Sequence, residues 1–505
     1  MYYAEDRNQL VIEDFYMPFG GRLDPKNRWV RLAGIMPWEH IEEIYLRTMS
    51  TETGRRAFSS RIAFGSLFIK EYENFTDERC VTAIQENPYM QYFLGLHEFR
   101  QEPLFDPSMM VHFRKRFPVE DVARINEYVC TGKWPEDGRN VDRNDEVEEE
   151  SEEDDHDNSG KPSGGKKSLK GKKNPNTSKK KKRRKKNHGK LIMDATVAPS
   201  DIKYPTDIDL LNQCRTHYET AIDILWKVLP HTGHKLPYST KKARKSYLNI
   251  AKSRRWTSKK LRKAIGEQLE YIEKAQKRFA QLMILAPEVK LPSWLLDRLQ
   301  VIPVVYAQQK EMYENHTHTC KDRIVSLSQS FVRPINRGKR PNPTEFGQKL
   351  HLSVVDGYTF LEQTSWSNFN ESVDLKTVAK DYRRKFGCYP EAILADKIYQ
   401  TRANRSWCKE RGIRLSGPAL GRPRSGEVGT KEVRQMYTDA CERNAIEGRN
   451  GNLKRRFGLD LIMSKLDETS KTEAALNILA MNAAHRLRRW LIRFFRFSTL
   501  GAVFQ

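Results

Sequence analysis

The chain contains 505 residues, which is too many for one hydrophobic core and predicts two or more domains. Its 89 lysines and arginines outnumber its 65 acidic residues, and the formal net charge of +24 favours a polyanionic partner, nucleic acid before membrane. The seven scattered cysteines form no CxxC pair, which argues against a disulfide framework and indicates a reducing compartment. No secretion signal is seen, and no uncharged apolar run approaches the length of a membrane span.

Residues 1–137 have the pattern of a mostly helical N-terminal domain. Apolar residues recur at helical spacing in residues 37–45, 61–70 and 106–117. Short helices with intervening turns fit a helix-turn-helix-like DNA-binding domain, and a plain helical bundle is the alternative.

The helix predicted over 106–117 carries the candidate DNA contacts of this domain. Asp106 is expected to be its N-cap, with Pro107 at the first helical position. Its cations would suit a helix laid on DNA phosphates, and we take as DNA-binding candidates Arg114, Lys115 and Arg116.

Residues 138–189 are of low complexity. An acidic block at 148–155 precedes a run of Lys and Arg at 179–186. Like charges repel and there is little apolar surface to bury, so this segment is predicted to be a disordered linker. Its basic block is expected to hold DNA backbone without reading sequence. Much of the excess positive charge sits here, so a solvated basic tail is the alternative source of the net charge.

Strand and helix patterns after residue 190 predict an α/β domain over 190–465. Strands are expected at 191–197, 323–327, 349–355, 358–361, 392–396 and 413–415, with helices at 375–386 and 400–410 and a long helix that opens near Arg443. This order is that of a ribonuclease-H-like domain with a mixed sheet. A helical insertion at about 208–315 interrupts it after the first strand, and residues 466–505 are predicted to form a C-terminal basic helix.

Three carboxylates are the candidate catalytic residues: Asp194, Asp396 and Glu447. Asp194 lies inside an apolar strand, where an unpaired charge is costly to desolvate, Asp396 ends a second apolar strand, and Glu447 lies on the long helix. Two-metal phosphoryl transfer needs carboxylates that converge on two cations roughly 3.5–4 Å apart, and oxygen ligands suit Mg²⁺ or Mn²⁺. We therefore interpret the three as ligands of two Mg²⁺ ions, for which Mn²⁺ would substitute.

The helix that carries Glu447 also carries two cations, Arg443 and Lys454. At about 100° per residue, both lie within roughly 40° of Glu447 on one helix face. A metal-binding carboxylate between two cations suits a phosphodiester ligand, so we expect both cations to bind DNA. The alternative is an ordinary surface glutamate with an ion pair one helical turn away.

Other carboxylates and a histidine cluster compete with these candidates. Asp201, Asp207 and Asp209 follow the first strand where Asp is an ordinary cap, and Asp356 precedes a glycine as in a turn. The segment 316–320 holds two histidines and a cysteine, but no second ligand pair at zinc spacing accompanies it. We therefore keep Asp194 as the first carboxylate.

The short sequence motifs around these residues resemble those of bacterial insertion-sequence transposases of the DDE type. The matching words in the catalytic region are Asp194-Ala195-Thr196, Tyr204-Pro205-Thr206-Asp207, Arg333-Pro334-Ile335, Glu345-Phe346-Gly347 and Leu394-Ala395-Asp396, and the spacing Arg443-xxx-Glu447-xxxxxx-Lys454 resembles the family's helix signature. The N-terminal region is similar to the domain that precedes the catalytic core in one large subgroup, through residues 86–96 and 113–116. Two positions depart from the family pattern: Ala440 stands where Tyr is frequent, and Ile398 stands where many relatives carry Gly.

The resemblance implies a Mg²⁺-dependent transposase with Asp194, Asp396 and Glu447 as catalytic metal ligands. Such an enzyme would bind the terminal inverted repeats of its element, release a 3′-OH by hydrolysis and join it to target DNA. We expect double-stranded DNA as partner, a homodimer or larger assembly on that DNA, no membrane, and a cytoplasmic, nucleoid-associated location. The alternatives are a catalytically inactive DNA-binding regulator and a nuclease of the same fold that cannot transfer strands.

Overall fold

A computed structural model describes residues 15–17, 20–50, 56–135, 186–229, 234–336, 344–418 and 426–501. Most of the predicted linker, residues 138–185, lies outside these ranges. In the ranges described, no helix combines the length and the apolar character that crossing a membrane requires.

The N-terminal part is helical, as predicted. It contains α1 (Arg28–Ala33), α2 (Trp38–Leu46), α3 (Ser60–Glu73), α4 (Asp77–Glu86), α5 (Pro88–Phe93), α6 (Met109–Arg114) and α7 (Val119–Thr131). Side-chain oxygens of Ser59, Thr76 and Asn87 accept backbone N–H bonds at the starts of α3, α4 and α5. The helix predicted over 106–117 is shorter at both ends. Asp106 instead accepts the N–H and the hydroxyl of Ser108, which holds a turn before α6.

A mixed sheet forms the centre of the second half of the chain. Its strands are β1 (Lys190–Pro199), β2 (Pro334–Asn336), β3 (Thr344–Val355), β4 (Tyr358–Ser365), β5 (Ala392–Leu394) and β6 (Arg414–Leu415). The order is β2-β3-β1-β5-β6, with β4 paired to β3. β3 runs antiparallel to β1 and β4, whereas β1, β5 and β6 are parallel. The strands predicted at 349–355 and 358–361 are confirmed within β3 and β4, and the left-handed residues Asp356 and Gly357, with φ of 49° and 81°, make the turn between them.

The strand predicted at 323–327 is wrong. Ile324, Val325 and Leu327 are buried, but the segment has no strand structure. The N–H of Ile324 donates to Oε1 of Gln308 in the preceding helix at 3.0 Å. Ile324 and Leu327 are buried in the core of the preceding helices, and Val325 packs with Val332 and Trp366, so the apolar residues reflect tertiary packing and not pairing with a strand.

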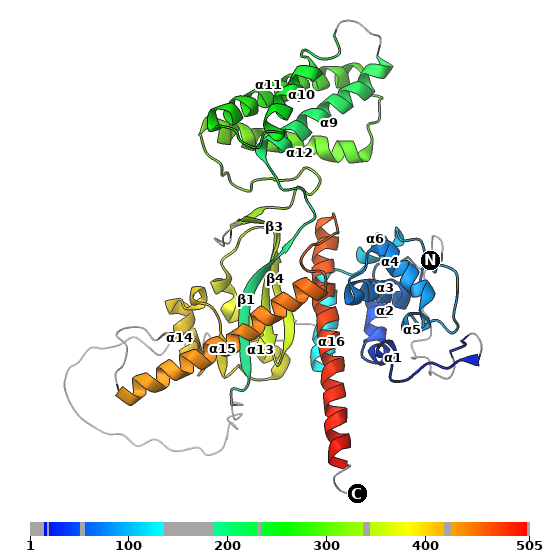
Figure 1. Ribbon diagram of the computed structural model, residues 1–505, viewed down its shortest axis with the longest axis vertical. Coiled ribbons are helices and arrows are strands. Elements are labelled where there is room, and N and C mark those ends of the chain that lie inside the picture. Colours follow the sequence, from blue (N-terminus) through cyan, green and yellow to red (C-terminus); the bar gives the residue numbers. More distant parts are fainter. Residues whose placement is uncertain are drawn as a thin grey trace, which may run out of the picture.

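Four long helices lie between β1 and β2 in the chain: α9 (Asp207–Val228), α10 (Thr240–Ala251), α11 (Ser258–Leu285) and α12 (Ser293–Glu314). They pack around their own apolar core, which includes Leu211, Ile272 and Ile302. In Figure 1 these helices form a separate group above the sheet, reached through the segments that follow β1 and precede β2.

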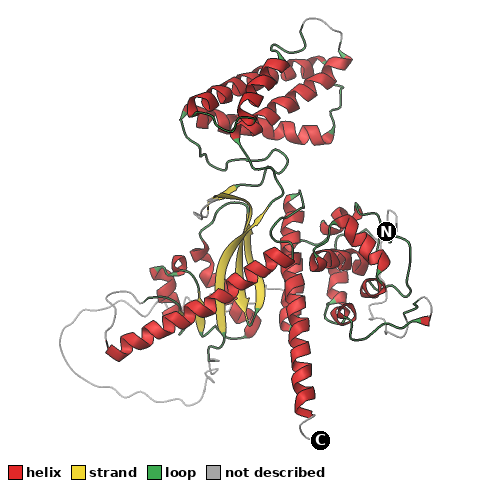
Figure 2. Cartoon of the chain, viewed as in Figure 1, coloured by secondary structure: helices red, strands yellow, loops and turns green. Residues whose placement is uncertain are grey.

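Helices cover both faces of the sheet (Figure 2). The short η4 (Glu371–Asp374) leads into α13 (Leu375–Phe386), and η5 (Lys397–Tyr399) precedes α14 (Arg402–Glu410). α13 and α14 pack on the face that presents Leu191, Met193 and Ile393. The other face, with Ile192 and Leu394, belongs to the core that includes residues of α15 (Gly426–Arg456) and α16 (Asp467–Gly501).

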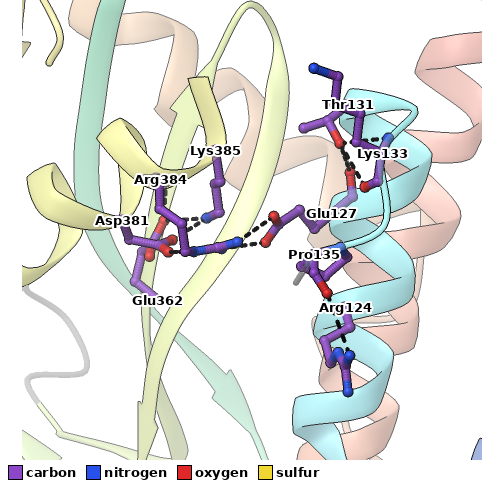
Figure 3. Close-up of polar contacts among 10 residues, drawn as sticks. Arg124, Glu127, Thr131, Lys133, Pro135, Glu362, Asp381, Arg384 and Lys385 are labelled. Atoms are coloured by element: carbon purple, nitrogen blue, oxygen red, sulfur yellow. Dashed lines mark hydrogen bonds and ion pairs between the residues drawn. The ribbon is translucent and has the colours of Figure 1, made fainter. Parts of the chain in front are cut away.

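The N-terminal helices share this second core with the sheet and α16. The side chain of Asn482 on α16 donates to Oδ1 of Asn126 on α7 at 2.8 Å and to the carbonyl of Thr359 on β4, and it accepts the N–H of Thr359 at 3.0 Å. On the neighbouring surface, Glu127 of α7 accepts two bonds from Arg384 of α13, at 2.7 and 2.6 Å (Figure 3). Asn126 also donates to the carbonyl of Thr359 at 3.1 Å, so α7 is hydrogen-bonded to α16, to α13 and to β4 of the sheet.

Candidate active site

Asp194, in β1, and Asp396, just after the neighbouring strand β5, stand at the same level. In the parallel pairing of β1 with β5, Ile192 is level with Leu394. Two residues further along the chain stand Asp194, within β1, and Asp396, which lies just past the end of β5 and keeps an extended backbone, with φ −71° and ψ 167°. Because parallel strands lie about 4.8 Å apart, the two carboxylates are brought side by side from positions 202 residues apart (396−194=202).

Both aspartates also belong to the same face of the sheet. Side chains alternate along a strand, so Asp194 shares the face of Ile192, and Asp396 shares the face of Leu394. This is the face on the side of α15, since Ile192 and Leu394 are in one core with Ile446. Asp194 is half-buried and Asp396 is exposed. Ala395, just before Asp396, is held by its N–H bond to the hydroxyl of Ser416 at 3.0 Å.

Helix α15 crosses these strands and is fixed to them by ion pairs. Asp439 pairs with Arg414 on β6, and Glu442 pairs with Lys190 at the start of β1 at 2.6 Å. Further along the helix, Ile446 and Leu453 are fully buried. Figure 1 shows α15 running obliquely across the sheet. The helix begins at Gly426, 17 residues before Arg443, so the expectation that it opens near Arg443 is wrong.

Glu447, next to the buried Ile446, is exposed, as Asp396 is. Its side chain is 60% exposed, and its carboxylate lies 3.7 Å from the guanidinium of Arg443. Among the described residues, no group of three or more His, Cys, Asp or Glu side chains is arranged to hold a metal ion. The structure therefore brings Asp194 and Asp396 together but does not join Glu447 to them, and its role as third ligand stays a prediction.

The cations predicted at the end of α6 occupy very different environments. Arg114 is 5% exposed and forms a two-bond ion pair with Asp77 on α4, so its burial does not support a DNA contact for this residue. Arg116 is half-buried and donates to the carbonyl of Thr48. Lys115 is exposed and stays a candidate for DNA contact.

The competing aspartates have structural partners. Asp201 pairs with Lys465, and Asp207 pairs with Arg323 at 2.6 Å. Asp209 lies 3.0 Å from Lys203 and accepts bonds from Tyr247 and Thr206. Each of the three aspartates after β1 thus has a cationic partner in the protein and needs no metal ion to balance its charge. This favours Asp194 as the strand carboxylate of the site.

A buried polar cluster lies just behind Asp194 and Asp396, and the sequence reasoning did not identify it. The hydroxyl of Tyr399 lies 2.9 Å from Nε2 of His351 and donates to Glu371 at 3.3 Å. Burial, followed by the negative charges of Glu371 and Asp194, raises the pKa of Tyr399 above its ordinary range. Burial lowers the pKa of His351. The N–H of Tyr399 bonds to the carbonyl of Asp396 at 3.1 Å, so this cluster anchors the turn that carries Asp396.

Gly347, in one of the words that carried the family resemblance, has a structural role. A Cβ atom there would lie 2.7 Å from Cα of Pro199 and still closer to the carbonyl oxygen of Ala198. Only glycine lets β3 approach the end of β1 this closely. The central strand pair that positions Asp194 depends on this approach.

Comparisons with known families agree with this arrangement. Residues 393–483, which include Asp396, Glu447 and the first part of α16, match a family model described as "Transposase DDE domain". Residues 18–116 match "Transposase domain (DUF772)". The chain matches a DDE-type insertion-sequence transposase. The DDE domain and the mixed sheet with its helices together support the predicted ribonuclease-H-like fold. Asp194 lies outside both matched segments.

The chain is also similar to a curated relative whose name states no activity. The chain is 36% identical over 111 residues to the "Uncharacterized protein ORF8 in nfe locus" of Rhizobium meliloti. This alignment covers 21% of the chain and 53% of the relative, so the chain spans about half of that relative's length. No solved structure matches the chain.

Proposed function

We propose that this chain is a DNA transposase that binds the terminal inverted repeats of its own element, hydrolyses a phosphodiester bond to release a 3′-OH, and transfers that 3′-OH to target DNA. The observation that carries the proposal is the position of Asp194 beside Asp396, on one sheet face and at one level, on the side covered by α15. The two transposase matches support it.

The donor set fits a hard divalent cation. Carboxylate oxygens are the ligands that Mg²⁺ and Mn²⁺ prefer, and Asp396 is exposed at the end of its strand. Asp194, Asp396 and Glu447 would hold two such ions, which activate an attacking oxygen and stabilise the leaving oxygen when bound. For Glu447 to bind metal, its carboxylate must leave Arg443 and turn toward the two aspartates.

The other residues of α15 would bind and orient the DNA strand. Arg443 and Lys454 follow the same helix face as Glu447, so a phosphate beside the carboxylates can accept from both cations. A phosphate that takes over Arg443 would release Glu447 toward the aspartates. Attack by water gives a 3′-OH, and in-line attack by that 3′-OH on a second phosphodiester completes the transfer. We infer that a homodimer or larger assembly holds the two element ends together.

The test uses the full chain, Mg²⁺ and labelled duplexes that carry the inverted repeats found beside the gene. Cleavage at the repeat end and joining of that end to a second duplex are both measured. Three variants are tested: Asp194→Ala, Asp396→Ala and Glu447→Ala. Each should abolish cleavage because a metal ligand is lost. Each should leave DNA binding nearly intact, because removing a carboxylate lessens the repulsion of phosphate.

The control for these variants is Asp201→Asn, which removes an exposed carboxylate seven residues from Asp194 and should cleave like wild type. If one of the three alanine variants cleaves at the wild-type rate, that residue is not a ligand. Cleavage without joining would identify a nuclease, and repeat binding without cleavage would identify an inactive regulator.

A further inference from the structure

The helices between β1 and β2 carry a concentrated positive surface that the candidate active site does not use. From residue 240 to 266 the chain has eleven Lys and Arg residues and no Asp or Glu. Ten of the eleven are exposed, and one of these ten, Lys263, lies 4.0 Å from Glu267. We call the other nine the basic face: Lys241, Lys242, Arg244, Lys245, Lys252, Arg254, Arg255, Lys259 and Lys260. Together they follow the outer side of α10, the turn after it and the first turn of α11.

The basic face lies opposite the side of α10 that packs on its neighbours. Ala243 and Ile250 are buried. At about 100° per residue, the cations of α10 fall on the opposite half of the helix. No ammonium or guanidinium group of the basic face forms an ion pair or a hydrogen bond within the part of the chain that the structure describes. These charges are therefore exposed to solvent and available to a ligand.

The arrangement works against the stability of the two helices. Neither α10 nor α11 has an acidic residue in its first turn, and Lys241, Lys242, Lys259 and Lys260 stand there instead. Cations at a helix N-terminus are unfavourable because the macrodipole is positive at that end. Lys241 and Lys245 also form a like-charge pair one turn apart. A bound polyanion would relieve each of these repulsions.

Further along α11, where no ligand is expected, lysines are neutralised by ion pairs within the helix. Lys274 lies 3.6 Å from Glu270, and Lys277 lies 2.8 Å from Glu273, both in i,i+4 ion pairs. The same helix thus changes from unneutralised cations in its first turn to paired cations further along. This contrast separates the basic face from an ordinary charged helix surface.

We propose that the basic face binds the phosphate backbone of double-stranded DNA, without reading its sequence, as a contact separate from the catalytic carboxylates. This inference rests on the proposed function in expecting DNA as the polyanion. α10 has 12 residues and spans about 18 Å, and duplex DNA presents one phosphate charge per about 1.7 Å of its axis, so several phosphates lie within reach of this helix.

The test measures binding of the full chain to a random-sequence duplex in EDTA, by fluorescence anisotropy, between 50 and 200 mM salt. The test variant is Lys241→Gln with Lys245→Gln, and the control is Lys274→Gln with Lys277→Gln, which removes the same charge from exposed lysines of the same group of helices. Each lost phosphate contact lowers the slope of log affinity against log salt by about 0.9. Two contacts give about 1.8, so across this fourfold salt range the wild type should lose roughly 12-fold more affinity than the test variant.

The control should keep the wild-type slope, and circular dichroism should show unchanged helix content in both variants. Equal slopes in the wild type and the test variant would overturn the proposal, as would equal losses in the test and control variants. A loss seen with single-stranded RNA but not with duplex DNA would also overturn it. Because no metal is present, the outcome does not depend on cleavage, so failure of this proposal and failure of the proposed enzymatic function are distinguishable.

Discussion

Arg114 offers a direct test of whether the end of α6 belongs to the protein core or to a DNA-binding surface. Its guanidinium pairs with Asp77, and the pair adjoins a buried cluster in which Lys70 lies 2.7 Å from Glu71 and 3.6 Å from Glu473 of α16. Arg114→Met keeps much of the side-chain length but leaves the carboxylates short of one cation. Removing one partner of a buried ion pair costs about 3–5 kcal/mol. Asp77 is 24% exposed and can be partly rehydrated, so we expect about 3 kcal/mol.

The assay is urea unfolding, followed by tryptophan fluorescence, to which Trp29 and Trp38 of the N-terminal core contribute, together with duplex binding under conditions where the protein is folded. Lys115→Met, at the exposed neighbouring position, is the matched control and should change the free energy of unfolding by less than about 0.5 kcal/mol. Asp77→Asn combined with Arg114→Met should recover part of the loss, because both charges are then removed. Wild-type stability of Arg114→Met, together with weaker DNA binding, would refute the core assignment and restore Arg114 as a DNA contact.

Two further predictions concern α16 and the buried groups around it. Burial raises the pKa of Glu71 from 4.5 to about 7, so its contribution to stability is full below pH 4.5 and is lost as the pH rises through 7. Between pH 5 and 8 the free energy of unfolding of Glu71→Gln should therefore increase relative to that of the wild type, by up to roughly 3 kcal/mol. A difference between the two proteins that does not change with pH in urea unfolding would contradict this. Asn482→Leu leaves the N–H and carbonyl of Thr359 without this partner and should lower the free energy of unfolding by about 2–4 kcal/mol. Asn477→Leu, on the same helix, is the control: its buried amide has no hydrogen-bond partner among the described residues, so the substitution should lower the free energy of unfolding little or raise it. If thermal unfolding ranks the two variants the other way, Asn482 does not hold α7 and α16 on the sheet.

Short-range patterns in the sequence were sufficient for most helices and strands. The helix at 375–386 was predicted with the bounds that the structure gives to α13. The hairpin at Asp356 and Gly357 was also predicted, because a glycine between two alternating apolar runs is a local signal. Asp194 could be proposed from sequence for the same reason, since a carboxylate inside an apolar strand is visible without any knowledge of its neighbours.

Contacts between distant segments could not be read from local patterns. The segment 323–327 is as apolar as a strand, but the N–H of Ile324 donates to Gln308, and Ile324 and Leu327 are buried in the core of the helices. Arg114 looks like an exposed cation until Asp77 and Glu473, 37 and 359 residues away, are brought against it. Periodicity reports which residues are apolar, and it does not report which element covers them.

The sequence by itself determined that the chain has a helical first part, a mixed sheet, and apolar strands ending at or containing Asp194 and Asp396. Only the tertiary structure decided that these two aspartates stand at one level on one face, because that depends on the hydrogen-bond register between β1 and β5. The structure also decided that α7 and α16 share a core with the sheet, where side-chain amides form hydrogen bonds between residues more than 100 positions apart. Register and burial are properties of paired segments, so neither can be fixed by one segment alone.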